Sequence, residues 1–192
     1  TDGFVTTWYD QSGNAANAFN VTSNQQPKIV SSGSTILDNG KPIMIGLNSN
    51  TRFNVNTALS PAQDVTSFFT GKNGGSLKGI ALNFKSGAST RYLYAAESGS
   101  TSNATSLGTI VNRLNGSTFA LTTRGALHSA TTNQSLLSAA MSETNNLDEL
   151  TKIGWAGGWA MWDTQELIVY NSDKSSDFSG IETNINTHYS IY

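Results

Sequence analysis

Short runs of alternating apolar and polar residues, separated by Gly, Asn and Ser, occupy most of the chain. Alternation with a period of two is typical of half-buried strands, and this punctuation is typical of the turns of a sandwich or barrel. The pattern predicts strands at residues 4–9, 28–30, 42–47, 65–70, 77–85, 91–96, 136–141, 150–155 and 166–170. The last run, ELIVY, is expected to be a buried central strand because it is almost continuously apolar.

The clearest local signal is a β-hairpin formed by residues 108–114 and 117–123. Asn115 and Gly116 join the two segments, and an Asn-Gly pair supplies the positive φ angles that a type I′ turn requires.

Helical periodicity is confined to the C-terminus, where a helix is expected to begin near Ser175 or Ser176. One apolar stripe with helical spacing contains Ile181, Ile185, Tyr189 and Tyr192. We expect this stripe to dock on the sandwich while Glu182, Asn184 and Asn186 face water.

Length and composition favour one all-β domain over residues 1–192. The chain has 25 Ser, 23 Thr, 20 Asn and 18 Gly, which is typical of an uncharged surface with many turns. Only 12% of the residues are charged and the net charge is -2, so nucleic acid is not an expected partner. No apolar run has the length of a membrane span, so no membrane insertion is expected, and the absence of Cys excludes disulfides.

Both ends of the chain carry a family resemblance. Residues 5–14 (VTTWYDQSGN), 26–30 (QPKIV) and 39–42 (NGKP), together with 166–170 and 181–192, resemble a concanavalin A-like, laminin-G-like domain of phage and bacterial surface proteins. The resemblance implies a two-sheet antiparallel jelly-roll sandwich with a short C-terminal helix, and it implies that this segment is the C-terminal part of a longer chain. Fold alone does not transfer function.

The resemblance also suggests where the protein acts. It implies a lectin-like adhesion or receptor-recognition module on a virion surface, such as a phage fibre or spike, or on a bacterial cell surface. The expected partners are a cell-surface glycan and other subunits of the same assembly. The alternative is a structural assembly domain without a ligand. No cofactor is expected, although calcium is a candidate because related sandwiches often carry it; no Asp-x-Asp-x-Asp run is present.

A weaker alternative is a glycoside hydrolase, because the YDQSGN segment is also similar to one in the catalytic sandwich of α-L-arabinofuranosidases. Such enzymes need two carboxyl groups at a defined separation. Four carboxylates remain as candidates, namely Asp10, Glu97, Asp163 and Glu166, although Asp10 is expected to bond backbone amides of the turn that it opens. No catalytic residue is assigned, and enzymatic activity is not expected.

The main candidate binding residues lie in a segment that contains three of the four tryptophans. Trp155, Trp159 and Trp162 surround flexible glycines and are followed by Asp163. Aromatic faces stack on sugars while polar groups bond hydroxyls, which predicts a glycan site; the alternative is that these rings fill the core. Trp8 is assigned to the core.

Three arginines are further candidates for binding. Arg91, Arg113 and Arg124 lie on or beside predicted strands, and their guanidinium groups suit acidic sugars or a neighbouring subunit. Exposed positions without a ligand are the alternative for each. The two histidines, His128 and His188, are 60 residues apart and indicate neither a metal site nor a catalytic triad.

Overall fold

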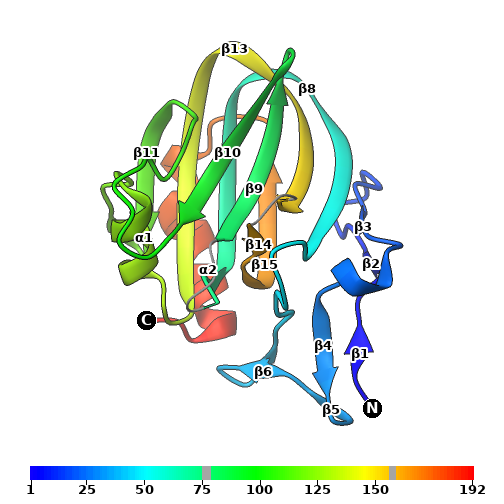
Figure 1. Ribbon diagram of the computed structural model, residues 1–192. Coiled ribbons are helices and arrows are strands. Elements are labelled where there is room, and N and C mark those ends of the chain that lie inside the picture. Colours follow the sequence, from blue (N-terminus) through cyan, green and yellow to red (C-terminus); the bar gives the residue numbers. More distant parts are fainter. Residues whose placement is uncertain (75–78, 156–158) are drawn as a thin grey trace.

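The computed structural model describes residues 1–74, 79–155 and 159–192. Its main feature is a curled sheet of ten strands, built around the long strands β8 (Arg52–Lys72) and β13 (Ser135–Gly154) (Figure 1). These two strands are antiparallel partners along most of their length, with register shifts near the middle of β13. Such irregularities bend a strand and increase its twist, which lets the sheet curl.

The main path of the sheet follows the order β10-β9-β13-β8-β3-β2, with β11, β12, β14 and β15 attached beside it. The bounds of these strands are β2 (Thr7–Trp8), β3 (Ala18–Phe19), β9 (Gly79–Ser86), β10 (Ser89–Ala96), β11 (Thr109–Leu114), β12 (Ser117–Thr118), β14 (Ala160–Met161) and β15 (Asp163–Tyr170). All the pairings are antiparallel except that of β14 with β9. The expected all-β, sandwich-like class with a short C-terminal helix is confirmed.

Several predicted strands are present with different limits. Residues 136–141 and 150–155 belong to one strand, β13, apart from Trp155. The strand predicted at residues 77–85 corresponds to β9, and its first two residues lie outside the described part of the chain. The prediction that residues 166–170 form a buried central strand is wrong. β15 pairs with β8 alone among the described strands, and these five residues are only partly buried.

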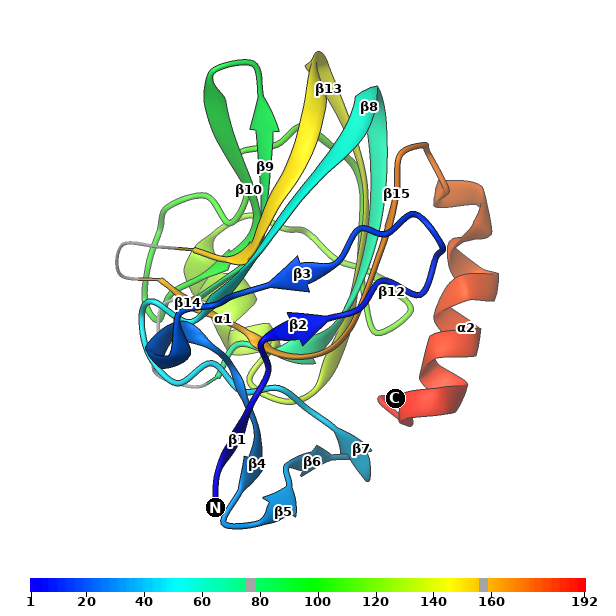
Figure 2. The same cartoon turned by 90° about the vertical axis from the view of Figure 1, so that its right-hand side faces the viewer.

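The strand predicted at residues 4–9 is divided between two sheets. β1 (Gly3–Phe4) pairs with β4 (Lys28–Ser31), whereas β2 joins the main sheet. The remaining small elements of this region are η1 (Ser23–Gln25), β5 (Ser34–Thr35), β6 (Leu37–Asp38) and β7 (Lys41–Pro42). Of the strand predicted at residues 42–47, only Pro42 belongs to β7. Figure 2 shows β1 and β4 to β7 below the main sheet; we call residues 1–47 the N-terminal flap.

The hairpin at Asn115 and Gly116 is confirmed, with φ angles of 50° and 75°. Its second strand is shorter than predicted, because the chain leaves β12 and forms α1 (Arg124–Ala130), a helix that the pattern did not predict. The Thr123 side chain caps α1 by accepting the Ala126 N–H at 3.2 Å. Only Leu127 of this helix is buried, so its sequence lacks an apolar stripe.

Alternating side chains of the long strands form two apolar cores. Phe69 and Leu137 belong to the larger core inside the curl, whereas Phe68 and Leu136 belong to a smaller core under the C-terminal helix. That helix, α2 (Phe178–Tyr189), follows the short η2 (Ser175–Asp177) and lies outside the sheet beside β15 (Figure 2). Its predicted apolar stripe packs there through Ile181, Ile185 and Tyr189, while the side chain of Tyr192 is 53% exposed.

One polar residue of α2 contradicts its predicted position. Glu182 was expected to face water, yet it is 1% exposed and accepts the Arg113 Nε–H at 3.1 and 3.0 Å. Arg113 also donates to the Gly116 carbonyl. The ion pair joins α2 to β11, and burial of the carboxylate is compensated by the guanidinium.

Substitution of Arg113 tests this pair. Arg113→Ala leaves a buried carboxylate without its cation, so the free energy of unfolding should fall by about 3 to 5 kcal/mol in urea denaturation. The double variant Arg113→Met, Glu182→Leu removes both charges and should recover most of that loss. A single variant that loses less than about 1 kcal/mol would show that the pair behaves as an exposed one.

Candidate functional site

The predicted tryptophan cluster does not form one surface. Trp162 is completely buried, and its ring packs edge-on against Phe69 with ring centroids 5.6 Å apart. Gly79 makes room for this ring, because a Cβ at that position would lie 2.6 Å from the indole. Trp162 therefore belongs to the core, which was the alternative to its prediction as a glycan-binding residue.

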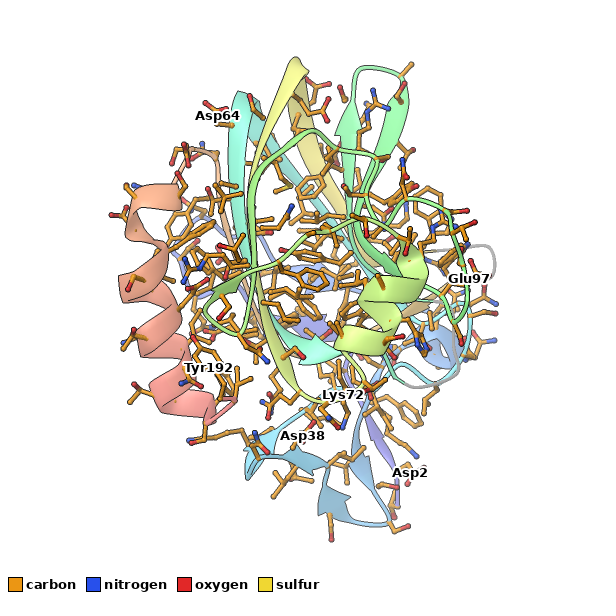
Figure 3. The ribbon with its side chains drawn as sticks, turned by 90° about the vertical axis from the view of Figure 1, so that its left-hand side faces the viewer. Asp2, Asp38, Asp64, Lys72, Glu97 and Tyr192 are labelled. Carbon is orange, nitrogen blue, oxygen red and sulfur yellow. The ribbon has the colours of Figure 1, made fainter. Side chains whose placement is uncertain are left out.

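Asp163 is also in the interior, with 9% of its surface exposed. Its Oδ1 accepts the Gly46 N–H at 3.1 Å, which ties the N-terminal flap to the start of β15. Burial raises the pKa of Asp163 from 3.8 to about 6, while the Gly46 hydrogen bond and nearby Lys72 oppose this change. Lys72 pairs with Asp38 at 2.8 Å, and Figure 3 shows these two side chains together at the base of the sheet. Asp163 thus holds two parts of the fold together.

Trp159 meets one of the predicted arginines. The Arg124 guanidinium carbon lies 4.6 Å from the Trp159 ring centroid and 5.4 Å from that of Tyr92. Arg124 also donates to the Tyr92 hydroxyl at 3.2 Å and pairs with Glu97 at 3.6 Å. The arginine therefore already has an acidic partner and two aromatic neighbours, which hold α1 against β10.

The other two arginines lie elsewhere. Arg113 pairs with Glu182 under α2, as described above. Arg91 is opposite Phe84 in the pairing of β10 with β9, and its Nε is buried without a hydrogen-bond partner among the described residues. Of the seven predicted binding residues, only Arg124 and Trp159 share a described contact.

One groove of the described surface lies between β2, other parts of the N-terminal flap and the start of β15, and we call it the Trp8 groove. It has a volume of about 460 Å³. Its lining residues are Val5, Thr7, Trp8, Tyr9, Gln11, Ile29, Pro42, Met44, Thr164 and Gln165. Trp8 packs against Phe53 with ring centroids 6.2 Å apart, so it touches the core as predicted, but it is only half-buried. Tyr9 beside it is 67% exposed.

A turn stabilised by Asp10 adjoins this groove. The Asp10 carboxylate accepts the N–H groups of Ser12 at 2.9 Å and Ala16 at 3.1 Å, and the Ser12 hydroxyl at 2.8 Å. These hydrogen bonds lower the pKa of Asp10. The predicted turn role of Asp10 is confirmed. Tyr9 and Gln11 flank Asp10 in the sequence, so the turn also fixes their backbone. Side chains alternate across a strand, so the assignment of Trp8 to the core could have indicated that Tyr9 faces outward.

A second groove lies at the end of β13, and we call it the Trp155 groove. Its volume is about 360 Å³. It is lined by Asn83, Phe84, Lys85, Ala88, Ser89, Thr90, Thr151, Lys152 and Trp155. The half-buried Trp155 is the member of the predicted cluster that lines this groove.

The remaining carboxylates do not meet in either groove. Asp163 lies against Gly46, whereas Glu166 is near His188 and Tyr189 of α2. Burial raises the pKa of Glu166, and His188 opposes this change. Within the described ranges, no three His, Cys, Asp or Glu residues are grouped as metal ligands.

Comparisons with protein-family models, with curated proteins and with solved structures find no match for this chain. Among the described residues, no helix has the length and apolarity needed to cross a membrane.

Titration of Asp163 should be visible in the stability of the fold. Burial raises its pKa to about 6. Between about pH 4 and pH 6 the carboxyl group is therefore protonated in the folded state but ionised in the unfolded state. The contribution of Asp163 to stability is therefore complete below about pH 4 and is lost as the pH rises through about 6, by on the order of 2 to 3 kcal/mol.

The control is Asp163→Asn, which keeps an oxygen acceptor for the Gly46 N–H but does not titrate. The free energy of unfolding of the native chain relative to this variant, measured in urea at intervals between pH 3.5 and 7, is expected to decline across that window. A constant difference would mean that Asp163 titrates as an exposed carboxyl group.

Proposed function

We propose that this chain is a carbohydrate-binding module and that a neutral glycan occupies the Trp8 groove. The observation that carries the proposal is the 67% exposed Tyr9 beside the half-buried Trp8, in a groove of about 460 Å³ without charged lining residues among those described. An exposed aromatic ring in a concave, uncharged site suits a ligand with both C–H faces and hydroxyl groups.

The polar groups of the groove suit a sugar. Thr7 offers a hydroxyl, and the exposed Gln11, whose Nε2 donates to the Tyr9 carbonyl at 3.1 Å, offers its amide oxygen for hydrogen bonds from ligand hydroxyls. Gln165, in contrast, already donates to the carbonyls of Asp38 at 3.0 Å and Lys41 at 3.3 Å. Gln165 therefore supports the wall, while Thr7, Tyr9 and Gln11 are the residues that contact the glycan.

The turn next to the groove supports binding through preorganisation. The Asp10 N–H donates to Asn17 at 2.9 Å, and the Asp10 carboxylate closes the turn as described. A backbone that is ordered before the ligand arrives loses less conformational freedom on binding. In the setting that the family resemblance implies, the module would attach a virion or bacterial surface protein to a cell-surface glycan.

A second candidate is a structural assembly domain, and the distribution of exposed apolar residues favours it. Six of the seven large hydrophobic residues exposed in the described part of the chain belong to the N-terminal flap. They are Phe4, Tyr9, Phe19, Val21, Leu37 and Leu47. Exposed large apolar side chains are typical of contacts with another subunit where they form a contiguous patch. Light scattering coupled to size-exclusion chromatography distinguishes the candidates, since an assembly domain should associate through the flap.

Substitution of Tyr9 tests the glycan proposal. Tyr9→Ala should lose at least about tenfold in affinity for a neutral oligosaccharide selected on a glycan array, as measured by calorimetry, because the stacking surface is removed. Tyr192→Ala, at another exposed tyrosine, is the matched control and should bind as the native chain does. If no neutral glycan binds, or if both variants bind equally well, the proposal fails.

A further inference from the structure

The Trp155 groove differs in chemistry from the Trp8 groove. Two lysines, Lys85 on β9 and Lys152 on β13, line it together with Trp155, and no acidic residue does so among its described lining. Neither lysine forms an ion pair with a described residue. Glu149 is opposite Lys85 in the pairing of β13 with β9, yet it does not line the groove. The groove therefore presents two ammonium groups without a salt-bridge partner among the described residues, beside an aromatic ring.

A buried acceptor in the same groove is also without a partner. The Asn83 side chain is fully buried, and its Nδ2 donates to the Gly154 carbonyl, which fixes the orientation of the amide. Its Oδ1 accepts no hydrogen bond from any described residue. Buried polar atoms are normally paired. Among the buried side-chain atoms that lack a partner in the described residues, this oxygen is the one that belongs to the lining of the Trp155 groove. The lysines supply donors for an anion, and Asn83 supplies an acceptor for a hydroxyl group.

Hydroxyl groups complete the lining. Ser89 and Thr90 come from β10, and Thr151 comes from β13, where its hydroxyl donates to the Asn83 carbonyl at 3.1 Å. The β9–β10 hairpin and the end of β13 thus place an aromatic ring, two ammonium groups and three hydroxyl groups around one hollow of about 360 Å³. That volume accommodates a short oligosaccharide rather than a folded partner.

We propose that the Trp155 groove is a second binding site, specific for a carboxylated saccharide such as a uronic acid. Trp155 stacks on the sugar ring, Lys85 and Lys152 bind the carboxylate, and the Asn83 Oδ1 accepts a ring hydroxyl. An ammonium group is a compact charge with several donors and suits a single carboxylate. The site goes beyond the neutral glycan proposed for the Trp8 groove and uses none of the same residues.

Charge and shape favour a sugar acid over a polyanion. A nucleic-acid strand requires a long basic track, whereas this groove has two cations on a chain whose net charge is -2. An inorganic phosphate would use the lysines but would leave Trp155 and the Asn83 acceptor without a role. A carboxylated sugar has a partner for each of these groups: a ring face for Trp155, a carboxylate for the lysines and a hydroxyl for Asn83.

The first experiment measures binding of trigalacturonate and of uncharged maltotriose by calorimetry at low and moderate ionic strength. The native chain should bind trigalacturonate more tightly than maltotriose at this site, and added salt should weaken the binding. Lys85→Gln with Lys152→Gln should reduce the affinity for trigalacturonate at least tenfold, and Trp155→Ala should do the same. The matched control, Lys41→Gln with Lys174→Gln, changes the net charge equally away from the groove and should leave the affinity unchanged.

Three outcomes would overturn this inference. They are absence of trigalacturonate binding, an equal loss in the control variant, and displacement of the sugar by tripolyphosphate at equal concentration, which would show that charge alone is recognised. Tyr9→Ala separates the two sites: it should leave trigalacturonate binding intact. If Tyr9→Ala leaves the affinity for neutral glycans unchanged while the lysine variant loses affinity for trigalacturonate, the Trp8 proposal fails and this one stands.

Discussion

The pairing of β8 with β13 is the interaction on which the rest of the structure depends. The two strands are 21 and 20 residues long, and their ladder continues across the register shifts that bend them. Because side chains alternate along each strand, one ladder supplies both the core inside the curl and the core under α2. β9, β11 and β15 pair with these two strands, so the main sheet is assembled on this pair.

The two grooves proposed as binding sites lie at different parts of the sheet that this ladder organises. The end of β13 carries Trp155 to the β9–β10 hairpin, while the flap, including its strand β2, forms a groove with the start of β15 at another part of the sheet. One groove has uncharged lining and the other has two lysines, although the chain as a whole is poor in charge. The two proposed sites, if both are occupied by one mixed polysaccharide, would raise its overall affinity, because the second binding event becomes intramolecular.

Buried polar groups hold together elements that are distant in the sequence. Glu182 and Arg113 join α2 to β11, Asp163 joins β15 to the flap, and Asn73 donates to the His128 carbonyl at the end of α1, at 2.7 Å. Each of these groups is shielded from water, so its hydrogen bonds are made in a low dielectric and its loss leaves an unpaired partner. The fold without disulfides therefore combines two apolar cores with a few such polar connections.

The sequence by itself determined the features that depend on local geometry: the all-β class, the Asn115-Gly116 turn, the Asp10 turn and the apolar stripe of α2. These follow from side-chain alternation, helical spacing and the φ preference of single residues. Only the tertiary structure decided that Glu182 is buried, because its partner Arg113 lies 69 residues away. It likewise separated Trp155, Trp159 and Trp162 into a groove, a contact with Arg124 and the core, since neighbours in sequence diverge where a strand ends and another begins. Burial and pairing depend on which strands meet across the sheet, and that choice is made by the whole chain.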